Sequence, residues 1–267
     1  MPELPEVETV VRTLRPKLVG SRINSVQLNR TDILLPSGFD LAGHLIGRRV
    51  EALSRRGKRI VFDLDDGNRF YVHLGMTGQL TVERIGSLQV IHTHFILTTD
   101  KTDVRFRDPR RFGGIWWLGT ESADINMGPE PLDLPPTRLA QQLAGTRRAI
   151  KSALLDQSVV AGLGNIYVDE SLFTAAIHPE QPANTLEMEQ IHRLNRAIKQ
   201  TLRQAIAHRG STLRDYMDAD GAAGGFQDRH RVYDQTGKPC RVCKTPIERI
   251  VLGGRSTHFC GKCQRRG

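Results

Sequence analysis

Apolar residues near the start of the chain recur with the period of an α-helix. The positions that share this spacing are Val7, Val10, Val11, Leu14 and Leu18. Gly20 follows as a residue that commonly ends a helix. Pro2 and Pro5 fix φ and remove two backbone donors, so the start of the chain is stiff. The pattern predicts a helix that begins near Pro5 and ends before Gly20.

From about residue 21 to 120 the apolar positions alternate instead. The clearest example has a turn at 65–67, and its alternating residues are Ile60, Phe62, Leu64, Phe70, Val72 and Leu74. Alternation of this kind, interrupted by turn residues, is typical of short antiparallel strands. We therefore expect a β-sandwich packed beside the first helix.

The second half of the chain returns to helical spacing. The proline-rich stretch 127–136 reads as a linker, and helices are expected over 138–156 and 185–208. Between them, VVAGLGNIYVDESLFTAAIHP predicts a glycine turn, a helix and a proline stop. Residues 211–230 are glycine-rich and irregular, which favours a mobile loop. We find no internal repeat.

All four cysteines lie in the last thirty residues, in the pattern C-x2-C, sixteen residues, C-x2-C. They are Cys240, Cys243, Cys260 and Cys263. The spacing is typical of a four-thiolate zinc site, and Gly253-Gly254 predicts a hairpin turn between the pairs. A disulfide module is disfavoured because no secretion signal precedes it. Four thiolates leave no open coordination position, so the predicted zinc ion is structural.

These patterns predict an α+β multidomain protein. Its expected parts are an N-terminal β-sandwich domain with a leading helix (1–130), a helical domain (131–225) and a C-terminal four-cysteine zinc-finger hairpin (226–267).

The net positive charge of the chain indicates which classes of partner it can bind. The 267 residues include 38 Lys and Arg against 29 acids, a formal charge of +9 and a pI of about 9.8. This balance favours nucleic acid first and an anionic membrane surface second. No apolar run approaches the ~20 residues of a membrane span and no signal peptide is recognisable, so a cytoplasmic protein is expected. At 6% aromatic residues a broad base-stacking platform is disfavoured, although single wedges are not.

The first residues allow two interpretations. Pro5 and the acidic Glu3 and Glu6 suit a helix N-terminus. Alternatively, removal of Met1 exposes the secondary amine of Pro2 as a nucleophile.

Two glycine-flanked turns are candidates for contacting DNA. HLGMTG places Met76, and DPRRFGG places Arg110 and Phe112, in turns between β segments. Such apolar residues usually belong to a core, but exposed beside arginine they suit wedges inserted into a base stack.

Further residues carry weaker signals. Lys58 in RRGKRI is either a phosphate contact or a solvated charge. His92 and His94 alternate on one strand face, but no third ligand lies nearby, so a metal site is less favoured than a phosphate contact or a simple surface role. GLGNIY lacks the third glycine of a dinucleotide-binding loop, but Asn165 at its helix start either contacts a phosphate or caps its own helix.

Taken in order, PELPEVET, RRGK, HLGMTG, DPRRFG, GLGNIYVDESLF and the four-cysteine finger closely resemble the formamidopyrimidine-DNA glycosylase family. The resemblance covers essentially the whole chain. The wider family includes endonuclease VIII. Leu4 at the start of this chain resembles the branch of the family that acts on oxidised purines and so favours that branch.

The resemblance implies base-excision repair of 8-oxoguanine and formamidopyrimidines in duplex DNA. It implies that mature Pro2 attacks C1′ of the damaged nucleotide and that Glu3 acts as the general acid. Lys58 matches the lysine assigned to β-elimination and Arg255 the arginine assigned to δ-elimination, while Glu6 resembles a positioning carboxylate.

The resemblance also implies a helix–two-turns–helix fold for the middle domain, one structural Zn²⁺ and a monomer associated with the nucleoid. The residues it assigns to DNA contact are Met76, His92, Arg110, Phe112, Arg147, Lys151, Asn165 and Arg214. The segment from Arg214 to Phe226 would cover the everted base. This chain departs from the family pattern at Gly225, where an aromatic residue is frequent, and at Asp234-Gln235, where Gly-Arg is frequent.

Two alternatives stay open on the sequence alone. One is an enzyme for oxidised pyrimidines. The other is a non-enzymatic, zinc-dependent DNA-binding protein, which would explain the charge and the finger but does not need a free proline at the start.

Overall fold

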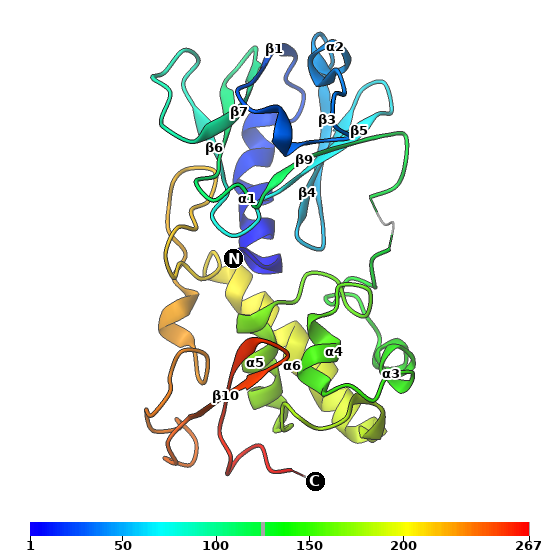
Figure 1. The fold of residues 1–267 in the computed structure, drawn as a ribbon, viewed down its shortest axis with the longest axis vertical. Coiled ribbons are helices and arrows are strands. Elements are labelled where there is room, and N and C mark those ends of the chain that lie inside the picture. The colour runs from blue at the N-terminus through cyan, green and yellow to red at the C-terminus, as the bar shows by residue number, and fades with distance from the viewer. Residues whose placement is uncertain (124–125, 267) are drawn as a thin grey trace. The chain divides into compact units, whose positions relative to one another are not determined.

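The computed structural model describes residues 1–123 and 126–266, and it forms two compact units (Figure 1). The first unit contains residues 1–123 and 208–225. The second contains residues 126–207 and 226–266.

The first unit begins with helix α1 (Leu4–Leu18), as the apolar spacing predicts. Glu3 is the N-cap, and its backbone N–H donates to the Glu6 carboxylate at 2.8 Å, which is half of a capping box. All the apolar residues of the predicted stripe are buried. The helix ends before Gly20, whose φ of +78° suits glycine.

Two sheets pack with α1 around one apolar core, which confirms the predicted sheet domain. The four-stranded sheet has the order β1 (Ile23–Leu28), β7 (Thr93–Thr99), β8 (Asp103–Arg107), β6 (Gln79–Glu83). The five-stranded sheet has the order β2 (Leu34–Leu35), β9 (Gly114–Gly119), β5 (Arg69–His73), β4 (Arg59–Leu64), β3 (Val50–Arg56). The alternating apolar residues of 60–74 are all buried between these layers.

One strand pair and three short elements depart from the simple alternation. Strand β2 pairs with β9 in parallel, whereas all other paired strands are antiparallel in the described part of the chain. β2 is only two residues long, too short to show a period. Helix α2 (Leu41–Leu45), capped by Asp40, and the 3₁₀ turns at Thr31–Ile33 and Ala183–Thr185 are likewise too short for a periodic signal.

The second unit is helical. It contains α3 (Pro136–Ala144), α4 (Ile150–Leu155), α5 (Asn165–Ala175) and α6 (Met188–Ala207). The prediction of one helix over 138–156 is wrong, because the chain turns between α3 and α4. Backbone N–H groups of Ala183 and Asn184 donate to the carbonyls of Arg148 and Thr146 in this turn, so tertiary hydrogen bonds replace the helical ones. None of the helices in the described ranges is long and apolar enough to span a membrane.

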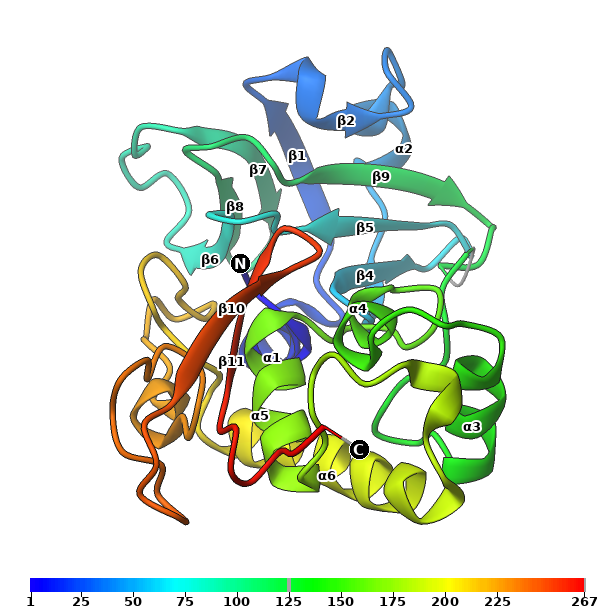
Figure 2. The same ribbon diagram turned by 60° about the horizontal axis from the view of Figure 1, so that its bottom comes forward.

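The C-terminal hairpin consists of β10 (Glu248–Leu252) and β11 (Arg255–Phe259), and a 3₁₀ turn at Phe226–Arg229 precedes it. Gly253 and Gly254 have φ of +56° and +73°, so the predicted two-residue turn is present and needs positive φ at both positions. Strand β11 packs against α5 (Figure 2).

Residues 208–225 form no helix or strand, as expected from their glycine content. They nevertheless belong to the first unit, where Tyr216 and Ala219 are buried in its core. Residues 208–225 thus belong to the first unit and the finger to the second, and the three-domain division expected from the sequence stays a prediction.

Candidate active site and nucleic-acid interface

The N-terminus of the first unit is held in place by Glu6. Pro2 and Glu3 are buried, and Met1 is about half exposed. One oxygen of the Glu6 carboxylate accepts from the N–H of Glu3 at 2.8 Å, and the other accepts from the N–H of Ser211 at 2.7 Å. The same carboxylate thus fixes the start of the chain and the glycine-rich segment.

The segment 208–225 fits closely against this carboxylate. A Cβ on Gly210, where φ is +77°, would lie 2.6 Å from a Glu6 carboxylate oxygen. The Tyr216 hydroxyl donates to the Glu6 carbonyl at 3.2 Å. Burial, with the Glu6 carboxylate beside it, raises the pKa of Tyr216, so the phenol stays protonated and keeps donating. Glu6 therefore has the geometry of a positioning residue.

Lys58 occupies the two-residue turn between β3 and β4, next to Gly57 with φ of +56°. Both strands pack on α1, and the Lys58 side chain is almost fully buried. Burial together with the nearby cations Lys58 and Arg59 lowers the pKa of His73 to about 4. The imidazole is neutral at pH 7, and its Nδ1 accepts from the Gly75 N–H at 3.1 Å.

The two glycine-flanked turns pack on each other. A Cβ on Gly75, at φ +62°, would lie 2.4 Å from the backbone nitrogen of Gly113, so no side chain fits there. The buried Asp108 carboxylate accepts from the Thr77 hydroxyl at 2.5 Å and from the Gly113 N–H at 2.8 Å. Asp108 therefore fixes both turns relative to each other.

These turns leave the predicted wedge residues outside the core. Met76 is 39% exposed and Phe112 is 56% exposed. The Arg110 guanidinium lies over the Phe112 ring at 4.8 Å from its centroid, a cation–π contact that orients both side chains. The core interpretation of Met76 and Phe112 is therefore disfavoured, and a contact with DNA stays a prediction.

His92, which precedes β7, and His94, which lies in β7, have different surroundings. His92 is exposed, with φ of +65°, whereas His94 is buried with its Nε2 2.8 Å from the Asp108 carbonyl oxygen. Within residues 1–123 and 126–266, the four cysteines are the only group of three or more side chains suited to a metal ion. A phosphate contact by His92 stays a prediction, and His94 supports the turn.

In the second unit, Asn165 is the first residue of α5. Its Nδ2 donates to the Ser256 carbonyl at 3.0 Å on β11, and its buried Oδ1 has no hydrogen-bond partner. Asn165 does not cap its own helix, because the N-cap is Gly164 and receives no side-chain bond. It instead links the start of α5 to the finger hairpin.

Lys151 differs from the expectation of a direct DNA contact. Its side chain is fully buried, and its ammonium donates to Asp169 Oδ1 at 2.6 Å and to the Ser256 carbonyl at 2.7 Å. The physical reason is its place on the inner side of α4, where Asp169 of α5 supplies the opposite charge. Lys151 therefore supports the hairpin from inside the unit, and its contact with DNA stays a prediction. Arg147, by contrast, is exposed, as are Arg214 in the first unit and Arg255 at the hairpin turn.

Two acids of α5 that the sequence did not single out anchor the finger. Asp169 Oδ2 accepts from the His258 N–H at 2.9 Å and lies 3.1 Å from its Nδ1. The buried Glu170 carboxylate accepts from the backbone N–H groups of residues 231–233, at 2.9 to 3.0 Å. Burial raises the pKa of Glu170, and these three donors oppose the shift. Adjacent acids on a helix that is otherwise apolar were the available sequence signal.

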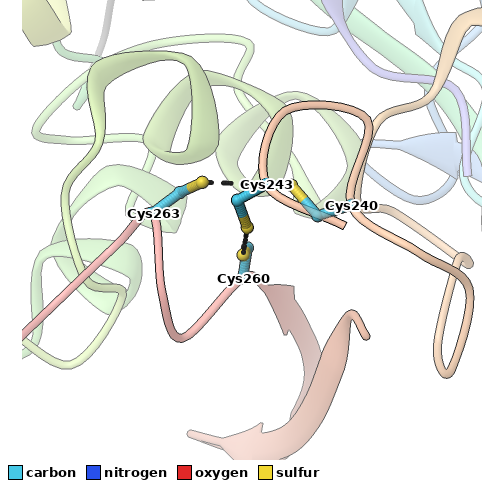
Figure 3. A group of neighbouring side chains, drawn as sticks. All are labelled: Cys240, Cys243, Cys260 and Cys263. Atoms are coloured by element: carbon cyan, nitrogen blue, oxygen red, sulfur yellow. Dashed lines mark hydrogen bonds between the residues drawn. The ribbon is translucent and has the colours of Figure 1, made fainter. Parts of the chain in front are cut away.

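The four cysteines come together as predicted (Figure 3). Their sulfurs all lie within 4.8 Å of one another, with Cys243 to Cys260 at 3.4 Å and Cys240 to Cys263 at 3.9 Å. Sulfurs bound tetrahedrally to zinc at about 2.3 Å are about 3.8 Å apart, so the cluster fits such an ion. Hydrogen bonds from Thr245 lower the pKa of Cys243 to about 6, which favours the thiolate that a metal needs.

Comparison with known proteins matches three family models in chain order. They describe the N-terminal domain of formamidopyrimidine-DNA glycosylase (residues 1–115), its H2TH domain (127–217) and a zinc finger found in FPG and IleRS (237–266).

Similar proteins span the full chain. Formamidopyrimidine-DNA glycosylases of Gluconobacter oxydans and Solibacter usitatus are 47% and 43% identical, over 99% and 100% of this chain and all of theirs. A Lactococcus lactis Fpg complex with DNA containing an abasic site superposes with a TM-score of 0.91 at 36% identity, covering 99% of this chain and 100% of that one. The MutM (FPG) protein of Thermus thermophilus gives 0.89 at 40% identity, covering both chains fully.

Proposed function

The chain belongs to the formamidopyrimidine-DNA glycosylase family, and we propose that it is a bifunctional enzyme that excises oxidised purines from duplex DNA and then cuts the abasic strand. Its expected substrates are 8-oxoguanine and formamidopyrimidines. The observation that carries the proposal is the fixed start of the chain, where Glu6 bonds the Glu3 N–H and holds residues 1–3 beside α1.

Pro2 is proposed as the nucleophile once Met1 is removed. Its nitrogen attacks C1′ of the damaged nucleotide while the C1′–N bond to the base breaks. An α-amino group titrates near ~8, and neighbouring cations and the start of a helix favour its neutral form. A secondary amine gives an iminium that stays cationic without a further proton, which makes it an electron sink for elimination. A proline start serves this chemistry better than an ordinary N-terminal residue.

Glu3 is proposed as the general acid that moves protons at the sugar and the leaving base. Glu3 is almost fully buried, and its side chain accepts from the backbone N–H of Glu6 in the capping box, so the carboxyl is held at the start of α1. The Glu6 carboxylate positions Glu3 by accepting from the Glu3 backbone N–H. The same carboxylate also accepts from the Ser211 N–H, so it is engaged by two donors. The two acids therefore have different roles although they lie three residues apart.

Lys58 and Arg255 are proposed to support the two eliminations. The C1′–O4′ bond first opens, O4′ takes up a proton and the iminium forms. In the first elimination the C2′ proton is removed, the electron pair moves toward the iminium and the C3′–O bond breaks, so the 3′ phosphate leaves. In the second, the C4′ proton is removed and the C5′–O bond breaks, so the 5′ phosphate leaves. The exposed Arg255 guanidinium, carried on a two-glycine turn, suits a phosphate flanking the lesion.

The DNA interface is proposed to combine wedges and phosphate contacts. Met76 and Phe112 fill the space left by the everted nucleotide, and Arg110 addresses the orphaned cytosine. The exposed His92, Arg147 and Arg214 and the half-buried Asn165 are also proposed to contact DNA. Lys151 acts indirectly by holding the Ser256 carbonyl that also binds Asn165. A formal charge of +9 supports a polyanionic partner.

The finger is proposed to hold one structural Zn²⁺ through its four cysteines, which are arranged for a closed tetrahedral site. The protein is proposed to act as a monomer in the cytoplasm, at the nucleoid, with the sequence divided into the catalytic, helical and finger regions given above.

The decisive experiment is the intact mass of the active protein before and after borohydride reduction with a duplex containing 8-oxoguanine. We expect a chain that lacks Met1 and a covalent adduct that maps to Pro2. Active protein that retains Met1, or intact DNA binding without any adduct, would refute the proposed mechanism. A matched duplex containing an oxidised pyrimidine separates this proposal from a pyrimidine-specific enzyme.

A further inference from the structure

The connection between β6 and β7, residues 84–92, presents an unusual group of exposed aliphatic side chains. Leu88 is 94% exposed, Ile91 73%, Val90 56% and Ile85 53%. This segment stands out from the four-stranded sheet (Figure 2). Exposed aliphatic residues that occur singly are ordinary, but four within residues 85–91 mark a surface that binds something.

The segment is fixed with its backbone toward the sheet. Arg105 of β8 is buried, and its guanidinium donates to the carbonyls of Ser87 at 2.7 Å and Leu88 at 2.8 Å. Arg107, two residues along the strand and therefore on the same face, donates to the Ile91 carbonyl at 3.1 Å. Because the carbonyls point at these arginines, the aliphatic side chains face solvent. Their exposure thus results from hydrogen bonds between the segment and the sheet and not from local unfolding.

Between Arg84 and His92, the part of the segment that carries the aliphatic side chains offers no contact to a DNA backbone. Its only polar side chains between Ile85 and Ile91 are Ser87 and Gln89. Ser87 Oγ donates to the Arg84 carbonyl at 2.7 Å, and Gln89 Nε2 donates to the Thr93 carbonyl at 3.3 Å. These donors are engaged within the protein, whereas phosphate recognition depends on available donors.

Charge and size indicate what would cover the aliphatic group. Two cations lie by the segment, the exposed Arg84 at its start and the half-buried Arg107 near Ile91. The exposed acid next to the segment is Glu83. The acid Asp103 is neutralised by its buried pair with Arg105 at 3.1 Å. Four aliphatic side chains cover at most a few hundred Å², roughly half or less of the ~800 Å² per partner that a stable dimer buries. The surface therefore fits a short acidic segment better than a second copy of the chain.

We propose that residues 84–91 form a docking surface for a short acidic peptide segment of a partner protein, with aliphatic or aromatic anchors placed on Leu88 and Ile91. This inference concerns recruitment and is independent of the chemistry proposed at Pro2.

The test uses the full-length protein and a defined probe, a fluorescein-labelled peptide in which aspartates flank two leucines and a phenylalanine. Fluorescence anisotropy at low salt should show saturable binding to the protein. The double variant Leu88→Gln/Ile91→Gln should weaken it about tenfold or more, because both anchors lose apolar contact. Ile46→Gln, at a site 49% exposed in the same unit, is the matched control and should leave binding unchanged.

Three outcomes would overturn the proposal. The first is peptide binding that is absent, or equal in the protein and the double variant. The second is equal binding of a peptide with asparagine in place of aspartate, which removes the charge argument. The third is a double variant that loses affinity for undamaged duplex DNA, or loses concentration-dependent self-association in sedimentation, since the surface would then serve DNA or a second copy. Unchanged melting temperature of the variant verifies that it is folded.

Discussion

Replacing Asp169 by Asn should destabilise the second unit from its centre. Asp169 lies fully buried on α5, where Oδ1 accepts from the Lys151 ammonium at 2.6 Å and Oδ2 accepts from the His258 N–H at 2.9 Å. Asparagine keeps the shape but removes the charge. It leaves the ammonium buried without a counter-charge and turns an amide donor toward at least one of these donors.

The expected cost follows from these contacts. Removing one partner of a buried ion pair typically costs about 3–5 kcal/mol. The Ser256 carbonyl, 2.7 Å from the Lys151 ammonium, still accepts one hydrogen bond in the variant. We therefore expect the lower end, about 3 kcal/mol.

Hydrogen exchange is the suitable assay, because a chain with two compact units does not guarantee one global transition. Amides of β11, with His258 as the central reporter, should exchange roughly a hundredfold faster in Asp169→Asn, since every 1.4 kcal/mol is a factor of ten. Amides of β4 in the first unit should be unaffected. The Asp169→Asn variant should also release zinc faster than the parent protein, by a similar factor.

The double variant Lys151→Met/Asp169→Leu is the matched control, because it removes both charges and fills similar volume. It should recover much of the lost protection, as replacement of buried ion pairs by apolar residues often does. Exchange of β11 in Asp169→Asn within about twofold of the parent protein would refute the reasoning, since that corresponds to less than ~0.5 kcal/mol.

The other predictions concern the reaction, the metal and pH. Pro2→Gly should reduce base release and strand cutting by orders of magnitude in a duplex-nicking assay, and unchanged activity would remove Pro2 as the nucleophile. Glu3→Gln should lose excision while still cutting a preformed abasic site, and full excision on the lesion duplex would contradict its role as the acid. Chelation of zinc should unfold the finger and abolish DNA binding, so an affinity indifferent to chelator would count against a structural ion. Burial lowers the pKa of His73 and of His230 to about 4, so below pH ~6.5 the unfolded chain takes up protons that the folded chain does not. The free energy of unfolding should be fully retained above pH ~6.5 and should fall by up to about 1.4 kcal/mol per pH unit per histidine toward pH 4. Urea midpoints that decline equally in the parent and in His73→Gln/His230→Gln would exclude this cause.

Periodicity predicted the elements that are long or strictly alternating. The stripe of α1, the paired strands around residues 60–74 and the two-glycine turn at Gly253 are all present. The break between α3 and α4 was missed because Gly145 is a weak signal in a helical pattern. The carbonyls of Thr146 and Arg148 in this break accept from the backbone N–H groups of residues 184 and 183, and no local pattern reveals these partners.

The candidate site divides in the same way. The four cysteines were recognised because their spacing is itself the constraint, whereas the glycines around Phe112 left both a core position and an exposed wedge open. Asp108, His73 and Asp169 were missed because each has partners that are distant in sequence, such as Thr77 for the first. The burial of Lys151 was not foreseen for the complementary reason, since a lysine near a predicted interface gives no sign in the sequence that it is buried.

The return of residues 208–225 to the first unit has a consequence for anyone who dissects the protein. The Val82 N–H on β6 donates to the Ala219 carbonyl at 2.9 Å, so a fragment that stops at residue 123 would expose an unsatisfied sheet edge. It would also leave a hole where Tyr216 fills the core. The amino-terminal half is thus finished only by a piece of chain made much later in synthesis, and a ribosome must translate about a hundred residues beyond β9 before that half can close.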